Sequence, residues 1–316
     1  MTKIISVLMS TFNETESQIR ESVESMLCQT YSDFELIIVN DKPERNDIKL
    51  ILNSYNYSRI KFYQNNLNLG LAMSMNKAAG LASSDVEIFA RMDADDIAVN
   101  TRLEKSFRCL TSGKYDCVFS QYYYIDENSN NLDSPLQPVI ADDKLSKVVA
   151  LHPVIHHPTV AFTKQIFKKV GGYRDFPCSQ DLDLWFRMCE AGCRFHMIGE
   201  PLLYYRMNSN SVSARKWFRQ QLTCNYIFEL SIQRIKTGKD SYSKEHYEEY
   251  LNDKGLENPK EERKLRKCYR DLSRAIKYRR QGKRFKAVFL RLKAFAESDI
   301  KRDAYWKFLK KKKILG

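Results

Sequence analysis

Residues 86–96 read Val86-Glu87-Ile88-Phe89-Ala90-Arg91-Met92-Asp93-Ala94-Asp95-Asp96, an apolar strand pattern that runs directly into three carboxylates. Upstream of this stretch, short apolar segments rich in β-branched residues alternate with segments whose apolar residues recur at helical spacing. The predicted strands are 4–9, 35–39, 59–63 and 86–90, with helical patterns near 19–27, 48–52 and 71–82 between them. Strands that alternate with helices indicate an α/β fold, with a mostly parallel sheet and helices on both faces.

Polar side chains follow three of these predicted strands. They form the clusters Ser10-Thr11-Phe12-Asn13, Asn40-Asp41 and Asp93-Ala94-Asp95-Asp96. Ligands of open parallel sheets bind beyond the carboxyl ends of the strands. We therefore expect a binding site where the three clusters meet at one edge of the sheet.

The carboxylates of Asp93, Asp95 and Asp96 repel one another unless a cation lies between them. Oxygen-rich sites of this kind select hard ions such as Mg²⁺ or Mn²⁺, which take their remaining ligands from water and substrate phosphates. The cluster therefore suggests a bound nucleoside diphosphate. The alternative is a solvated turn that caps a helix expected near Thr101, and the spacing alone leaves both open.

Several enzyme classes are excluded by missing motifs. The chain has neither G-x-G-x-x-G nor G-x-x-x-x-G-K-[ST], which argues against a dinucleotide-dependent oxidoreductase and a P-loop kinase. It also has no run of about 18 apolar residues and no signal-peptide pattern, so we expect it to stay in the cytoplasm.

Positive charge is concentrated at the C-terminal end of the 316 residues. Residues 260–316 hold 22 Lys and Arg against 6 Asp and Glu, whereas residues 1–259 have a net charge of −3. Within 283–296 one helical stripe is apolar and basic residues flank it, which is the composition of an interfacial amphipathic helix. The stripe comprises Phe285, Val288, Phe289, Leu292 and Phe295. An anionic membrane or nucleic acid would suit this region, and the alternative is a helix packed on the main domain.

Seven segments resemble the family-2 glycosyltransferases of the GT-A fold, in the family's order and spacing across residues 3–213. They are SVLMSTFN (6–13), QTYSDFELIIV (29–39), RMDADD (91–96), HPTV (157–160), GGY (171–173), QDLDLWFR (180–187) and LYYR (203–206). The resemblance implies a GT-A catalytic domain over 1–213, followed by a basic helical region over 214–316.

The resemblance also implies the roles of individual residues. The nucleotide-sugar would be bound by Ser10, Thr11, Asn13, Asp41, Gly70, Asn76, Asp93 and Arg206. Among these, Asp41 would hydrogen-bond the uracil edge, and Arg206 would either neutralise a phosphate or hold the edge of the domain. Asp95, supported by Asp96, would bind Mn²⁺ or Mg²⁺.

Asp181 matches the catalytic base of the family. At the start of a helix we expect it to be ionised, because the helix dipole favours its charge; the alternative is a plain capping residue. Trp185 would lie in the core or stack on a sugar, and His157 would face the donor or lie in the core. The family often has an acid, an Arg and a His where this chain has Asn40, Met75 and Asn208.

The implied reaction is inverting and metal-dependent. It would move a hexose from UDP-glucose or UDP-galactose to a saccharide, such as an undecaprenyl-diphosphate-linked sugar in O-antigen or capsule synthesis. A rhamnosyl- or N-acetylhexosaminyl-transferase of the same fold is one alternative, and a basic nucleic-acid-binding protein is another. We expect no nucleic-acid partner, and we expect peripheral attachment of the C-terminal region to the inner face of the bacterial inner membrane.

Overall fold

The computed structural model describes residues 5–207 and 217–315. The chain divides between residues 211 and 212 into two compact units, named here the N-terminal unit and the C-terminal unit. The expected boundary at 213/214 and Asn208 both lie outside the described residues. The assignment of catalysis to 1–213 therefore stays a prediction.

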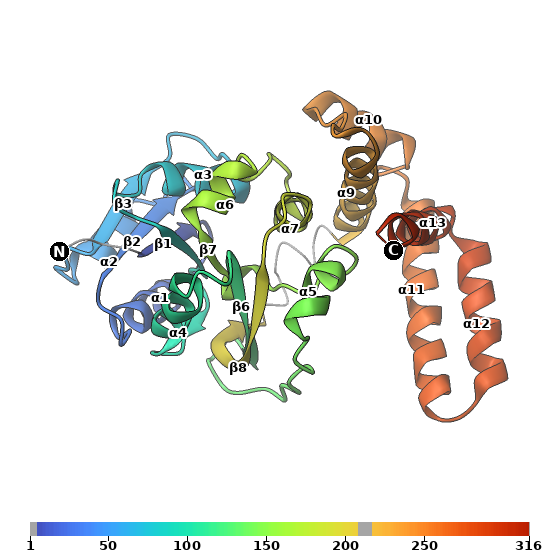
Figure 1. Ribbon diagram of the computed structural model, residues 1–316, viewed down its shortest axis with the longest axis horizontal. Helices are drawn as coiled ribbons and strands as arrows, with labels where there is room; N and C mark the ends of the chain where they lie inside the picture. Colours follow the sequence, from blue (N-terminus) through green and yellow to red (C-terminus); the bar gives the residue numbers. More distant parts are fainter. Residues whose placement is uncertain (1–4, 208–216, 316) are drawn as a thin grey trace. The chain divides into compact units, whose positions relative to one another are not determined.

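The N-terminal unit is built on an eight-stranded mixed sheet with the order β3-β2-β1-β4-β7-β6-β8-β5 (Figure 1). Strands β1 to β4 run parallel, β7 is antiparallel to both β4 and β6, β6 and β8 are parallel, and β5 is antiparallel to β8. The strand bounds are β1 (Ile5–Thr11), β2 (Phe34–Asn40), β3 (Ile60–Gln64), β4 (Ile88–Asp93), β5 (Ile97–Ala98), β6 (Cys117–Ile125), β7 (Ala161–Thr163) and β8 (Phe195–Arg206).

Helices cover both faces of this sheet, because successive strand side chains point to opposite sides. Ile5, Val7 and Met9 of β1 pack with α1, α2 and α4, whereas Leu8 packs with the helices of the other face. In Figure 1, α3 and α6 lie above the sheet, and α1 and α4 lie below it. The bounds are α1 (Glu16–Leu27), α2 (Asp47–Asn53), α3 (Leu71–Gly80), α4 (Arg102–Thr111), α5 (Asp142–Val149), the 3₁₀ helix η1 (His157–Thr159), α6 (Lys164–Lys169) and α7 (Gln180–Glu190).

The sequence predicted the α/β alternation of the first half, and the structure confirms it. Helix α1 begins at the expected capping box, where the Thr15 hydroxyl accepts from the Gln18 backbone N–H and the Gln18 side chain accepts from the Thr15 N–H (2.8 Å). Strand β4 extends beyond the predicted 86–90 to Asp93, and β8, for which no strand was predicted, ends on Arg206. Both residues are therefore fixed by sheet pairing rather than held in loops.

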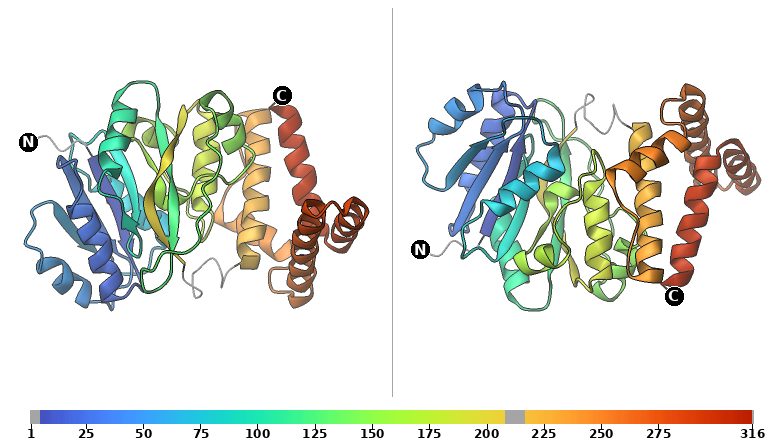
Figure 2. Two further views of the ribbon diagram at one scale, coloured as in Figure 1. Left: turned by 90° about the horizontal axis from the view of Figure 1, so that it is seen from below. Right: turned by 90° about the horizontal axis from the view of Figure 1, so that it is seen from above.

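The C-terminal unit is helical (Figures 1 and 2). Its described helices are α9 (Trp217–Thr237), α10 (Lys244–Asp253), α11 (Pro259–Arg280), α12 (Arg284–Glu297) and α13 (Asp299–Ile314). Helix α10 was not predicted from the sequence, and it begins where the Ser243 side chain accepts from the His246 backbone N–H. Helices α11 and α12 lie side by side as a hairpin that turns at Gly282 (φ +76°).

Among the described residues, no helix has both the length and the apolarity needed to cross a bilayer.

Candidate functional site

The carboxyl ends of β1, β2 and β4 meet at one edge of the sheet, as the sequence predicted. Ser10 of β1 is paired with Asp93 of β4, and Thr11 is paired with Asn40 of β2. The register therefore brings together side chains that are up to 83 residues apart along the chain.

Asp93, Asp95 and Asp96 form an acidic cluster beyond this edge. One carboxylate oxygen from each lies within 4.8 Å of the other two. The Ser22 hydroxyl donates to the Asp93 carbonyl (2.9 Å), and the Arg206 backbone N–H donates to Asp96 Oδ1 (2.9 Å). The cluster is therefore held from both α1 and β8.

Burial and mutual repulsion perturb the acids of this cluster. Burial first, then the charges of Asp93 and Glu14, raise the pKa of Asp95 to about 7. Burial, Asp93 and Asp95 raise the pKa of Asp96 well above its ordinary value, and burial raises that of Glu14. Asp96 Oδ2 is buried and has no hydrogen-bond partner among the described residues. These oxygens fit a divalent cation, which would supply the positive charge that the ionised acids need.

Two buried arginines lie beside the acidic cluster, and sequence reasoning missed both. The Arg91 guanidinium forms an ion pair with Asp93 and is almost fully buried. Arg102 donates to the Pro158 carbonyl (2.6 Å) and the Arg91 carbonyl, and burial lowers the pKa of Arg102 to about 10. The available signal was a lone arginine at position 91 inside an otherwise apolar strand.

Arg206 ties the acidic cluster to distant parts of the N-terminal unit. Its guanidinium donates to the Asp95 carbonyl (2.7 Å), to a Glu21 carboxylate oxygen (2.6 Å) and to acceptors in the segment 126–129. All three guanidinium nitrogens therefore have protein partners, and the side chain is buried. Of the two roles weighed from the sequence, this geometry favours holding the edge of the domain over contacting a phosphate.

Asp41 anchors the loop before α3. Its carboxylate accepts from the Asn65 amide (2.7 Å) and from the backbone N–H groups of Leu69 (2.8 Å) and Gly70 (2.9 Å). A carboxylate offers about four acceptor positions, so about one is left for a ligand. Gly70 adopts φ +80°, and a Cβ added there would meet open space, so its constraint is the backbone conformation alone.

Three other predicted nucleotide-binding residues, Ser10, Thr11 and Asn13, lie at or just beyond the end of β1. Thr11 is fully buried and its hydroxyl donates to Asn40 Oδ1 (3.2 Å), so it offers a ligand no exposed surface. Asn40 accepts this bond, and its amide nitrogen lies within hydrogen-bond distance of three further oxygens. Ser10 is buried beside Asp93, whereas Asn13 is exposed and accepts from Lys42 Nζ (2.8 Å).

Asn76 joins α3 to the turn before α7. Its amide donates to the Tyr173 carbonyl (2.8 Å) and accepts from the Tyr173 N–H (2.9 Å). A Cβ on Gly172 would lie 2.7 Å from Asn76 Oδ1, and Gly172 has φ +70°. Position 172 therefore requires glycine, because only glycine permits both this backbone conformation and this close approach of Asn76.

Asp181 lies in the first turn of α7, within electrostatic reach of Asp93 and Arg91. The sequence considered only the helix dipole, which favours the ionised carboxylate, and the structure adds an opposing effect of burial. Burial raises the pKa of Asp181 above its ordinary value, against the hydrogen bonds from the N–H groups of Asp181 and Leu182, which lower it. Desolvation outweighs the helix terminus here.

His157 and Trp185 belong to the core of the face that holds α7. His157 Nε2 is 2.7 Å from the Tyr173 hydroxyl oxygen, and burial lowers the pKa of His157 well below its ordinary value. The Trp185 ring packs near Phe162 and His157, and the side chain is buried. Both residues therefore lie in the core, which was one of the two positions considered for each from the sequence.

Comparisons with known proteins give one matching family model and several similar sequences. The sequence model described as Glycosyl transferase family 2 matches residues 6–171. An uncharacterized glycosyltransferase of Methanocaldococcus jannaschii, MJ1057, is 34% identical over 72% of this chain and 78% of its own. The O-antigen biosynthesis glycosyltransferase WbnJ of Escherichia coli is 32% identical over 66% of this chain and 81% of its own.

Solved structures of S. aureus TarS share the fold. TarS 1–349 in complex with UDP-GlcNAc is similar over 98% of this chain and 89% of that one, with a TM-score of 0.62 and 15% identity. This chain spans 42% of the longer TarS structure, with a TM-score of 0.56.

Proposed function

Because the chain belongs to glycosyltransferase family 2, we propose that its strand-edge site transfers a hexose from a nucleoside-diphosphate sugar to a saccharide acceptor, with inversion and with a divalent metal. The observation that carries this proposal is the acidic cluster, whose three carboxylates lie within 4.8 Å of one another. The raised pKa values of Asp95 and Asp96 mean that ionisation of these two acids costs free energy unless a cation binds there.

Asp95 and Asp96 are the proposed ligands of Mn²⁺ or Mg²⁺. When bound, the cation would take up the negative charge that develops on the diphosphate leaving group. The protein's part is to hold the carboxylates in place through Arg206 and to balance Asp93 with the buried Arg91. Asp93 then faces the ribose or the sugar from the end of β4.

The donor side is proposed to lie along β1, β2 and the loop before α3. Asp41 holds the backbone of Leu69 and Gly70 in place, which fixes the wall against which a base would lie. UDP is the first nucleotide to test, since the related fold of TarS was solved with UDP-GlcNAc. UDP-glucose and UDP-galactose are the proposed donors, with UDP-N-acetylhexosamines and dTDP-rhamnose as alternatives.

Asp181 is the proposed general base. Its carboxylate would accept the proton of the acceptor hydroxyl while that oxygen forms a bond to the anomeric carbon. The bond from the anomeric carbon to the diphosphate breaks on the opposite face, so the configuration inverts. A pKa raised by burial suits this role, because a base whose pKa lies nearer the operating pH takes up a proton more readily.

The acceptor and the location are also part of the proposal. WbnJ, which is 32% identical, is named for O-antigen biosynthesis. An undecaprenyl-diphosphate-linked saccharide of O-antigen or capsule synthesis is the proposed acceptor. Such an acceptor is anchored in the inner membrane, and the basic C-terminal unit would hold the protein at the cytoplasmic face.

The test separates donor binding from turnover. Release of UDP from a panel of UDP-sugars is measured with Mn²⁺ and with EDTA, and UDP binding is measured in parallel. Asp181→Asn should lower turnover by about 10² to 10⁴ and leave UDP binding unchanged. Glu190→Gln, an exposed acid at the far end of α7, is the matched control and should change neither quantity. Normal turnover in Asp181→Asn would remove Asp181 from the chemistry.

A further inference from the structure

We propose that the outward face of α12, continued by the aromatic residues of α13, docks on an anionic lipid bilayer. This inference rests on the proposed function, because a lipid-linked acceptor requires the enzyme to work at a membrane surface. It extends the proposed function by naming the surface that binds the membrane, the side chains that enter the lipid and the charge of that lipid.

Helix α12 has its small apolar residues inside and its large ones outside. Ala287 and Ala294 are its buried residues. By contrast, Phe285 is 94% exposed, Phe289 66% and Leu292 67%. With Val288, which is also exposed, they recur at i, i+3, i+4 and i+7, so they share one face of the helix. A helix that only completed this hairpin would have no reason to carry large apolar side chains there.

The apolar surface continues onto α13. The rings of Phe295 and Tyr305 are 5.0 Å apart, and the Tyr305 and Trp306 rings follow at 6.0 Å. Trp306 is 65% exposed. Tyr and Trp are enriched where proteins meet the headgroup region of a bilayer, because their rings are apolar and their tips are polar. The two helices together therefore present one surface suited to the membrane interface.

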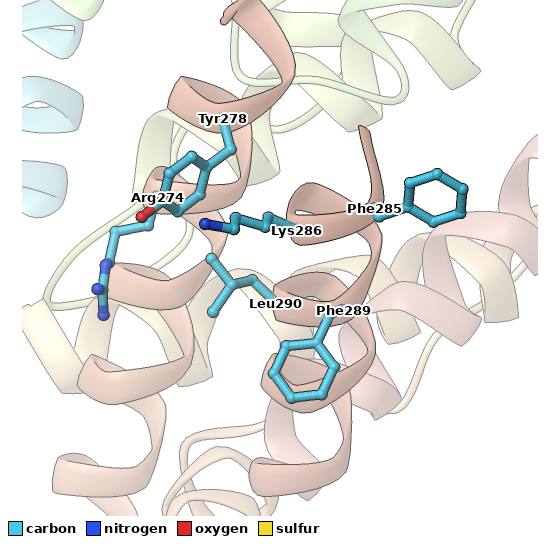
Figure 3. A pocket seen from close by; sticks show the side chains of 6 residues that line it. All are labelled: Arg274, Tyr278, Phe285, Lys286, Phe289 and Leu290. Atoms are coloured by element: carbon cyan, nitrogen blue, oxygen red, sulfur yellow. The ribbon is translucent and has the colours of Figure 1, made fainter. Parts of the chain in front are cut away.

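A shallow groove of about 460 Å³ lies between α11 and α12 (Figure 3). The Lys286 ammonium points across it toward α11, where its nitrogen lies 5.9 Å from the centre of the Tyr278 ring, and Arg274 lies on the same wall. Phe285, Phe289 and Leu290 line the groove on the α12 side. The groove thus offers cations for a lipid phosphate beside apolar side chains for the acyl chains.

Charge identifies the kind of membrane. Residues 260–316, which form α11 to α13, carry 22 basic and 6 acidic residues. Each basic residue near an anionic leaflet adds to binding, and this contribution weakens as salt screens it. Nucleic acid would also attract the charge, but aliphatic Val288 and Leu292 offer bases no stacking surface, whereas they gain free energy in lipid. The combination favours anionic lipid.

The test is sedimentation of the full chain with vesicles of equal parts phosphatidylglycerol and phosphatidylcholine, and with phosphatidylcholine alone. We expect binding to the anionic vesicles that weakens with salt. Phe285→Ser and Phe289→Ser should each weaken it by about tenfold. Leu50→Ser is the matched control, because Leu50 is an apolar residue of the N-terminal unit that is 72% exposed, and it should have no effect.

The proposal would be overturned by absence of binding to anionic vesicles, by unchanged binding in both Phe285→Ser and Phe289→Ser, or by equal binding to the two kinds of vesicle. A preference for a single-stranded RNA probe would overturn it as well. A vesicle-free dimer that the phenylalanine variants dissociate would show that a second copy covers the face. A fall in thermal stability of these variants without vesicles would show that the face packs on the rest of the chain.

The same variants keep this inference separate from the proposed function. None of the substituted residues lies at the strand-edge site, so UDP binding and turnover with a water-soluble acceptor should be unchanged in them. Loss of vesicle binding with intact UDP binding would support the docking surface. Intact vesicle binding without UDP binding would refute the donor site and leave the docking surface standing.

Discussion

Replacing Asp95 by asparagine should make the metal-free protein more stable at neutral and alkaline pH, although it removes a proposed metal ligand. The folded-state pKa of Asp95 is about 7, above its ordinary value of 3.8. A folded state that binds a proton more tightly than the unfolded state loses stability as pH rises between these two values. The asparagine has no charge to bury and so escapes this loss.

The size of the effect follows from the pKa shift. About three pKa units correspond to roughly 4 kcal/mol at 1.36 kcal/mol per unit, which is an upper limit for an acid that shares its environment with two others. We therefore expect a gain of about 2–4 kcal/mol above pH 7 and almost none near pH 4. For a unit of this size, that gain raises the midpoint of thermal unfolding by roughly 5–15 °C.

Scanning calorimetry in EDTA across this pH range measures the difference directly. Asp116→Asn is the matched control of opposite sign. The guanidinium and the backbone N–H of Arg194 lower the pKa of Asp116, so loss of this carboxylate should destabilise the protein at neutral pH. Adding Mn²⁺ at one hundred times its Kd should stabilise the wild type by about 2.7 kcal/mol. It should not stabilise Asp95→Asn. A metal-free Asp95→Asn variant that is less stable than wild type at pH 8 would refute the reasoning.

Three further predictions concern the residues that build the site. Gly172→Ala should cost about 2–3 kcal/mol in urea denaturation, because its Cβ would lie 2.7 Å from Asn76 Oδ1 at φ +70°. Gly192→Ala, with φ +80° and open space, should cost only about 1 kcal/mol, and equal losses would contradict the packing argument. Arg206→Lys should lose about 3–5 kcal/mol of stability, because a buried charge loses most of its partners; a loss below 1 kcal/mol would deny its tethering role. Metal-dependent turnover should fall about tenfold per pH unit below 7, since a proton on Asp95 competes with the cation; a flat kcat/KM profile from pH 5 to 8 would contradict this.

Local sequence patterns predicted the first half of the sheet and the edge that carries the acids. Buried parallel strands are short apolar runs, and each polar residue that ends one marks the same edge. Once β1 and β4 pair in parallel, their register places Ser10 beside Asp93. This part of the fold could be predicted because its signals lie within a few residues of one another.

The supporting contacts could not be predicted, because their partners lie far apart along the chain. Arg206 meets Glu21 across 185 residues and Asp96 across 110. No periodicity connects such positions, and the interpretation of the sequence slightly preferred a phosphate contact to an edge contact for Arg206. The Asn76 amide and Tyr173 are a similar pair, 97 residues apart.

The direction of the pKa shift of Asp181 needed the structure for a different reason. A helix start is visible in the sequence, and it alone predicts a stabilised carboxylate. The desolvation that opposes it depends on how other elements cover α7, and that is a property of the whole unit. The sequence therefore predicted Asp181 at the start of a helix, whereas the upward shift of its pKa follows only from the structure.

The central claim is that the acidic cluster holds a divalent cation that binds the diphosphate of a nucleotide donor. Calorimetric titration of UDP into the full chain, in Mn²⁺ and in EDTA, tests it most directly. The account predicts binding that requires Mn²⁺ and that is lost in Asp95→Ala. UDP binding of equal affinity with Mn²⁺, with EDTA and in Asp95→Ala would contradict it.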